Sequence, residues 1–164
     1  MLVFRCTHRV VRRFHLPLTE KVTASTGVLG DWYANLIYAG RVPWVLCQSE
    51  QSLLPVLLRA RKDTFPGQFG LALARLWRRL GIPDDRITLE IEAAADLRFA
   101  RPMNRKVLGV LNDFGSLAKD DLSPTGDMQG AVEVALRLAQ TLSSPIAYTL
   151  FLAPGPLGMS CAET

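Results

Sequence analysis

The stretch that decides the fold is DWYANLIYAGRVPWVLCQSEQSLLPVLLR, residues 31–59. It divides into three runs rich in β-branched and aromatic residues, which favour strands. Short polar turns separate these runs at Gly40 and at residues 49–51, and turns this short join strands that reverse direction. Pro43 and Pro55 have no backbone N–H to donate, which favours strand starts or edge positions. The stretch therefore predicts an antiparallel β-meander.

Apolar spacing around the meander predicts further strands and helices. Residues 84–94 fit either a short helix or a strand, because their period is ambiguous. Strands come first and helices mostly later, which favours an α+β fold. We expect an antiparallel β-meander packed against three to four helices as a single pair of layers. Outside residues 84–94, the expected strands are 2–7 and 96–103, and the expected helices are 69–80, 104–119 and 127–141, with about two helical turns at 8–16.

The chain of 164 residues suits one domain. We expect a single α+β domain over residues 1–146 and a loosely structured tail, rich in proline and glycine, over 147–164. No apolar run reaches the roughly 18 to 20 residues that cross a bilayer, and the first residues lack a secretion signal. The three cysteines are far apart, without the spacing of a zinc or redox motif. These features predict a cytoplasmic protein without a membrane partner.

The N-terminal segment is the most basic part of a chain whose net charge is +4. One acid, Glu20, accompanies its five basic residues, which are Arg5, Arg9, Arg12, Arg13 and Lys21. A basic stripe of this kind can follow phosphates, whereas the plainer interpretation is a solvated helix face. Arg9, Arg12 and Arg13 are the candidate binding residues for a nucleic acid or an acidic protein.

Polar residues interrupt two apolar segments and form the other candidate site. In GDWYANLIY, residues 30–38, Asp31 and Asn35 share a strand face with Tyr33. In RKVLGVLNDFG, residues 105–115, Arg105 and Asn112 share a helix face, and Asp113 lies beside them. If the helix packs on the meander, these side chains converge.

Two interpretations of this convergence remain open. Asp31, Glu50 and Asp113 are candidate catalytic carboxylates, because one carboxylic acid and one carboxylate suffice for general acid/base hydrolysis. The alternative is a structural network in which Asp31 caps a turn, Asn35 satisfies backbone groups and Asp113 pairs with Arg105. Arg105 is also a candidate partner for any carboxylate that is buried. His8 and His15, the only histidines, have no neighbouring ligand that indicates a metal site, and no cofactor motif is present. The candidate binding residues beside the carboxylates are Trp32, Tyr33, Asn35, Asn104, Arg105 and Asn112.

Five blocks of the sequence together resemble a family of small, mainly bacterial proteins that is classed as a domain of unknown function. They follow one another from about residue 2 to 146, and GDWYANL and NR-x-VLG-x-x-NDF are the most specific. The resemblance implies one intact domain and no activity, and the tail after Ile146 does not follow it. The blocks are FRCT, GDWYANL, SEQSLLPVLL, NRKVLGVLNDF and LRLAQTLSSPI.

Two functional hypotheses follow from the sequence. The first is a small non-catalytic binding or regulatory module, which uses its basic face for nucleic acid or an acidic partner. The second is a cofactor-independent hydrolase, such as a glycosidase, which uses Asp31, Glu50 or Asp113. The exposure of these carboxylates separates the two, because catalysis requires an open cleft and a structural network requires burial.

Overall fold

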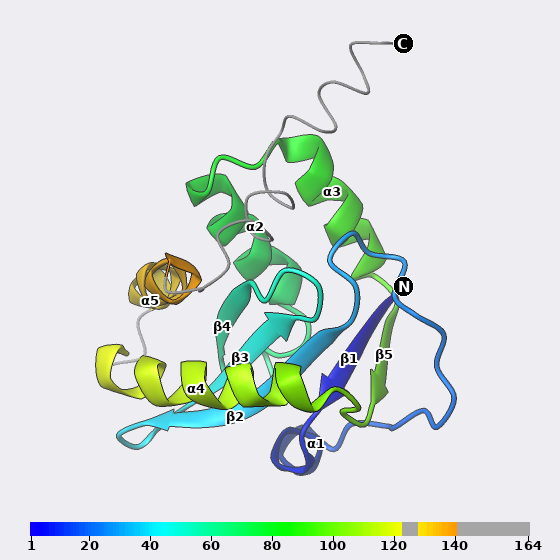
Figure 1. Cartoon of the computed structure of the whole chain (residues 1–164), viewed down its shortest axis with the longest axis horizontal. Coiled ribbons are helices and arrows are strands. Elements are labelled where there is room, and N and C mark those ends of the chain that lie inside the picture. Colours follow the sequence, from blue (N-terminus) through cyan, green and yellow to red (C-terminus); the bar gives the residue numbers. More distant parts are fainter. Residues whose placement is uncertain (123–127, 141–164) are drawn as a thin grey trace.

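A computed structural model describes residues 1–122 and 128–140 of the chain, and it combines one sheet with helices on both faces (Figure 1). The expected α+β class is confirmed. In chain order the described elements are β1 (Leu2–Cys6), α1 (His8–Phe14), β2 (Trp32–Ala39), β3 (Val42–Ser49), β4 (Pro55–Arg59), α2 (Phe69–Arg79), α3 (Asp84–Ala93), β5 (Leu97–Ala100), α4 (Arg105–Asp121) and α5 (Met128–Gln140).

The five strands form one sheet in the order β4-β3-β2-β1-β5. The predicted meander is present, because β2, β3 and β4 pair antiparallel in sequence order. Gly40 opens the turn between β2 and β3 with φ of 63°, a backbone conformation that glycine adopts without strain. The expectation of a purely antiparallel sheet was wrong, because β1 runs parallel to both β2 and β5. Long connections make these parallel pairings accessible, because α1 lies between β1 and β2, and β5 follows only after the meander, α2 and α3.

The two faces of the sheet carry different helices. On one face, Trp32 and Phe4 both pack edge-on against Phe69 of α2. On the opposite face, Ile37 of β2 contacts α4 so closely that a Cβ on Gly115 would lie 3.1 Å from its Cγ2. The expected single pair of layers was therefore wrong, because helices cover both faces. Figure 1 shows α4 crossing in front of the strands, with α2 and α3 behind them.

The helices follow the apolar periodicity closely. The ambiguous segment 84–94 is the helix α3, so the described residues hold five helices and not three to four. Asn104 caps α4, because its side-chain oxygen accepts hydrogen bonds from the backbone N–H groups of Lys106 and Val107. Leu111 and Val107 of α4 are buried as predicted. The tail assigned to residues 147–164 lies outside the described residues.

Candidate functional site

Asn112, a polar residue within the apolar pattern of α4, faces β2 and meets the polar side chain of Asn35 there. Asn35 Nδ2 donates to Asn112 Oδ1 at 3.4 Å, and Asn35 Oδ1 accepts from Thr7 Oγ1 at 2.9 Å. Tyr33 Oη accepts from the backbone N–H of Asn104 at 3.0 Å. Two separate polar contacts therefore join β2 to α4. One is between Asn35 and Asn112, and the other is between Tyr33 and Asn104. The expected approach of the two segments is present at these residues.

Asp31 belongs to a different network, on the β1 side of β2. Its carboxylate accepts from Arg5 Nε at 3.0 Å and from the backbone N–H and Oγ of Ser25 at 3.0 and 2.8 Å. Arg5 Nη1 donates in turn to the carbonyl oxygen of Arg101 at 3.1 Å. The buried carboxylate is thus paired, as its burial requires, but its partner is Arg5 and not Arg105. The reason is the parallel pairing, which places β1 directly beside β2.

Of the remaining candidates, Glu50 lies beside Asp31, because its backbone N–H donates to the carbonyl oxygen of Asp31 at 2.9 Å. Asp113 and Arg105 occupy the exposed side of α4, and Glu50 is half-buried at the turn after β3. Trp32 and Tyr33 are fully enclosed in the core, where neither ring faces solvent. The hydrolase hypothesis gains no support from this arrangement, because Asp31 is sealed by donors and Asp113 faces outward.

Of the basic residues of the N-terminal segment, Arg9, Arg12 and Arg13 stand on the exposed side of α1. Arg9 lies over the ring of Tyr38 at 5.8 Å from its centroid, and Arg13 Nε donates to the carbonyl oxygen of Ala60 at 2.9 Å. Arg12 makes no hydrogen bond or ion pair with any described residue. Two of the three guanidinium groups are therefore held in place by the body of the protein, and the third extends into solvent.

Two adjoining cavities open beside the start of α1, where β1 and β5 end. One has a volume of about 410 Å³ and is lined by Arg5, Leu18, Thr19, Glu20, Ala100, Arg101 and Met103. The other has a volume of about 370 Å³ and is lined by Cys6, His8, Val11, Leu18, Arg101 and Pro102. Leu18 and Arg101 line both, so the two cavities meet at these residues. Burial raises the pKa of the Cys6 thiol to about 12, which keeps it protonated and unreactive near neutral pH.

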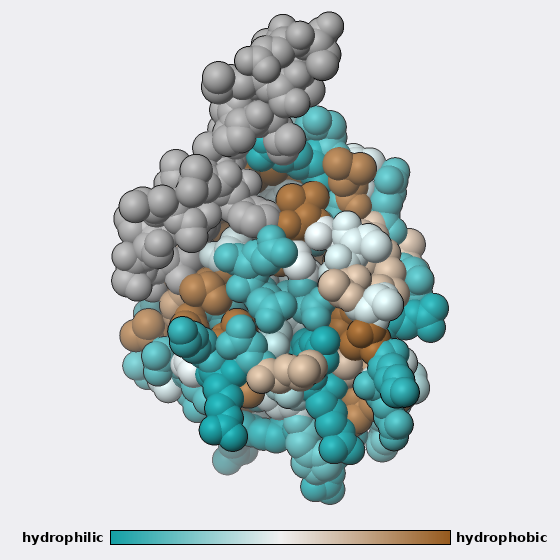
Figure 2. Space-filling model, turned by 45° about the vertical axis from the view of Figure 1, so that its right-hand side comes forward, coloured by the Kyte–Doolittle hydropathy of each residue, from teal (hydrophilic) through white to brown (hydrophobic). Residues whose placement is uncertain are grey.

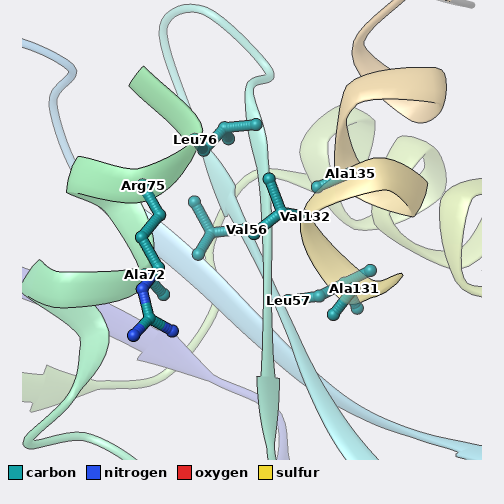
Figure 3. Close-up of a pocket in the computed structure, with 8 residues that line it drawn as sticks. All are labelled: Val56, Leu57, Ala72, Arg75, Leu76, Ala131, Val132 and Ala135. Atoms are coloured by element: carbon teal, nitrogen blue, oxygen red, sulfur yellow. The ribbon is translucent and has the colours of Figure 1, made fainter. Parts of the chain in front are cut away.

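A third gap, between α2, β4 and α5, is too small to be a site. It is lined by Val56, Leu57, Ala72, Arg75, Leu76, Ala131, Val132 and Ala135 (Figure 3). Its volume is about 10 Å³, which is the space of about one water molecule. Over residues 1–122 and 128–140, no three His, Cys, Asp or Glu side chains come close enough to share a metal ion. None of the helices in these ranges is long and apolar enough to cross a bilayer.

Comparison with known families gives one match, and it spans both segments that meet at the β2–α4 contact. Residues 3–150 match the family described as a domain of unknown function (DUF6933). The chain belongs to the DUF6933 family. No curated protein and no solved structure matches it. In this DUF6933 domain, the blocks GDWYANL and NRKVLGVLNDF hydrogen-bond to each other where α4 packs on β2.

Sequence reasoning missed one buried acid of the DUF6933 domain, Glu90 of α3. It is fully enclosed and accepts hydrogen bonds from the backbone N–H of Val28 at 2.8 Å and from Trp32 Nε1 at 3.4 Å. A Cβ on Gly27 would lie 2.6 Å from the Glu90 carboxyl group, so this loop packs closely on the acid. Helical spacing could have indicated this burial, because Glu90 shares the buried side of α3 with Ile87.

The enclosed Glu90 predicts a specific pH dependence of stability. Burial raises the pKa of this carboxyl group above its ordinary value of 4.5, against smaller lowering effects of its hydrogen bonds. The folded state then binds the proton more tightly than the unfolded chain does, so stability is greatest below the unfolded pKa. We expect the free energy of unfolding to fall as the pH rises from about 4.5 through the raised pKa of Glu90.

Urea unfolding of the wild type and of Glu90→Gln at several pH values measures this effect. Other acids titrate in the same range, so the informative quantity is the difference in free energy of unfolding between the two proteins. That difference should shift in favour of Glu90→Gln as the pH rises. A difference that stays constant from pH 4 to pH 8 would show that Glu90 titrates alike in the folded and unfolded chains.

Proposed function

We propose that the chain is a non-catalytic nucleic-acid-binding module that contacts the phosphate backbone through the exposed side of α1. The proposal rests on the exposure of Arg9, Arg12 and Arg13 and on their lack of an acidic partner. All three are exposed, and none forms an ion pair with a carboxylate of the described residues. Guanidinium groups without an acidic partner are available for phosphate oxygens, which they bind in a bidentate geometry.

Several arginines elsewhere on the surface differ from these three. They lie in the sequence or in space beside carboxylates, and their charges are compensated within the protein. The exposed pairs are Arg61–Asp63, Arg78–Asp84, Arg79–Glu133, Arg98–Asp96 and Arg137–Asp121. Arg75 of α2 and Arg105 of α4 are also exposed without an ion pair among the described residues. Three such arginines lie together on the seven residues of α1, and this concentration favours the phosphate-binding interpretation over the solvated one.

The surroundings of α1 suit a polar, charged partner. The lower end of the molecule, where α1 lies in Figure 1, presents mainly hydrophilic side chains in the space-filling view (Figure 2). Tyr38, which is 39% exposed, lies beneath Arg9 and offers a ring edge at the same surface. The tryptophans are buried, so recognition through a row of stacked bases is not favoured. We therefore propose contact with the backbone and not with base sequence.

The test is the salt dependence of binding. Fluorescence anisotropy with a labelled single-stranded oligonucleotide should show affinity that falls steeply as salt is raised, because phosphate contacts release counterions. Arg12→Gln should reduce the slope of log K against log salt by about one unit. Arg78→Gln is the matched control, because it removes an equally exposed arginine that is already paired with Asp84, and its slope should equal that of the wild type.

Two results would count against the proposal. One is the absence of oligonucleotide binding by the wild type at low salt. The other is equal binding of polyglutamate, which carries a similar density of negative charge without phosphates. The second result would assign the same surface to an acidic protein.

A further inference from the structure

The two adjoining cavities lie at a distinctive point of the sheet. β1 and β5 are adjacent parallel strands, and each is followed by a helix. The helix after β1 is α1, which packs on the α2 face, since Phe14 contacts Phe65 and Phe65 contacts Phe4. The helix after β5 is α4, which packs on the opposite face through Ile37 and Gly115.

Adjacent parallel strands whose connections leave to opposite faces create a crevice outside their carboxyl ends. In sheets of this kind the crevice is the usual place for a ligand. The cavity linings fit this geometry, because they include Cys6 from the end of β1, Ala100 from the end of β5 and Arg101 directly after it. The cavities thus lie at the ends of β1 and β5, and the segments around Leu18 and Arg101 complete their walls.

The lining of the larger cavity has three kinds of group. Arg5 is held rigidly, with Nε on Asp31 and Nη1 on the carbonyl of Arg101, and its side chain remains 13% exposed. The side chain of Arg101 is exposed and forms no hydrogen bond or ion pair with other described residues. The unpaired guanidinium group of Arg101 is suited to an anionic group such as a phosphate. Asp31 offsets the charge of Arg5, which can add the N–H donors that its two bonds leave free.

The other two kinds of group indicate which chemical groups the rest of the ligand carries. Glu20 and Thr19 offer oxygen atoms that accept hydrogen bonds from hydroxyl groups. Leu18 and Met103 are apolar side chains that remain 37% and 76% exposed, and they offer a surface for an apolar ring. An anionic group, hydroxyl groups and an apolar ring are together the parts of a nucleotide. The volumes of about 410 and 370 Å³ lie in the range of small-molecule sites.

We propose that the crevice at the ends of β1 and β5 binds a nucleotide phosphomonoester, with Arg101 and Arg5 on its phosphate. The nucleotide is either free or the 5′-terminal unit of a nucleic-acid strand. The second source rests on the proposed function, because α1 would then carry the backbone of the same strand. His8 and Val11 of α1 line the smaller cavity, so the crevice and the basic helix are contiguous.

Three probes separate these sources. They are adenosine 5′-monophosphate and two labelled single-stranded oligonucleotides of the same sequence, one with a 5′-phosphate and one with a 5′-hydroxyl. We expect the monophosphate to bind, as measured by isothermal titration calorimetry. We expect the phosphorylated strand to bind about tenfold more tightly than the hydroxyl strand, since charge-assisted hydrogen bonds to one phosphate have this magnitude.

Three variants assign the contacts. Arg101→Gln should abolish monophosphate binding and the 5′-phosphate preference, while its melting temperature stays that of the wild type because its side chain is exposed and unpaired. Arg12→Gln should weaken both strands equally and leave the monophosphate unaffected. Arg78→Gln, the control, should change none of the three affinities.

The outcomes distinguish the two proposals. If neither the monophosphate nor the 5′-phosphate preference responds to Arg101→Gln, the crevice proposal is overturned, and equal binding of both strands would leave the proposed function standing. If the monophosphate binds through Arg101 and neither strand binds, the proposed function is overturned and the ligand is a free nucleotide. A 5′-phosphate preference that is lost in Arg101→Gln supports the strand end as the source.

Discussion

Asp31→Ala should lower the free energy of unfolding by about 3–5 kcal/mol, because it leaves a largely buried arginine without its counter-charge. The side chains of Arg5 and Asp31 are only 13% and 8% exposed. Removal of the carboxylate also leaves the N–H and Oγ of Ser25 without their acceptor. Urea unfolding monitored by circular dichroism measures the loss.

Asp113→Ala is the control for this change. It removes the same kind of side chain from the exposed side of α4, where the expected effect is within about 0.5 kcal/mol. The double variant Arg5→Met with Asp31→Leu tests the cause. If the loss comes from the unpaired charge, the double variant should recover most of the stability. An equal loss in the double variant would assign the effect to the packing of the loop at Ser25.

Leu111→Ala should cost about 2–5 kcal/mol, because it opens a cavity where α4 packs on the sheet. Leu111 is fully buried, whereas Leu117 of the same helix is 51% exposed. Leu117→Ala makes the identical chemical change on the outer side, and its effect should stay within about 0.5 kcal/mol. Similar losses in the two variants would contradict this reason, because alanine favours the helix at least as well as leucine and only lost packing could then explain the cost at Leu117.

Much of the fold could be predicted from periodicity. The meander and the helices α2, α4 and α5 follow the apolar spacing of their own segments, which depends only on local geometry. The parallel pairing of β1 with β2 and β5 could not be predicted this way, because the apolar spacing within a strand does not indicate which distant strand it pairs with. One signal was present and was not used. The run WYANLIYA is apolar at nearly every position, and such a run is typical of a strand covered on both faces.

Only part of the candidate site could be predicted, because residue spacing indicates local geometry but not the pairing of distant strands. The approach of Asn35 to Asn112 was predicted, because both residues lie at fixed positions within regular elements that pack together. The partner of Asp31 was not predicted. Arg5 lies 26 residues away along the chain and becomes a neighbour only through the parallel pairing of β1 with β2. The prediction that Asp113 faces a polar pocket shared with Asp31 and Asn35 was wrong, because Asp113 lies next to the boundary of the apolar stripe and is exposed.

The central place of β1 has a consequence for the order in which the protein can be assembled. β1 lies between β2 and β5 and is synthesised before both of them, so it gains its second neighbour only when Leu97–Ala100 has followed. Until then one edge of β1 carries unpaired backbone groups, which can pair with another chain. A growing chain is therefore most exposed to misassociation before residue 100, and a pause in synthesis shortly before β5 would prolong that interval.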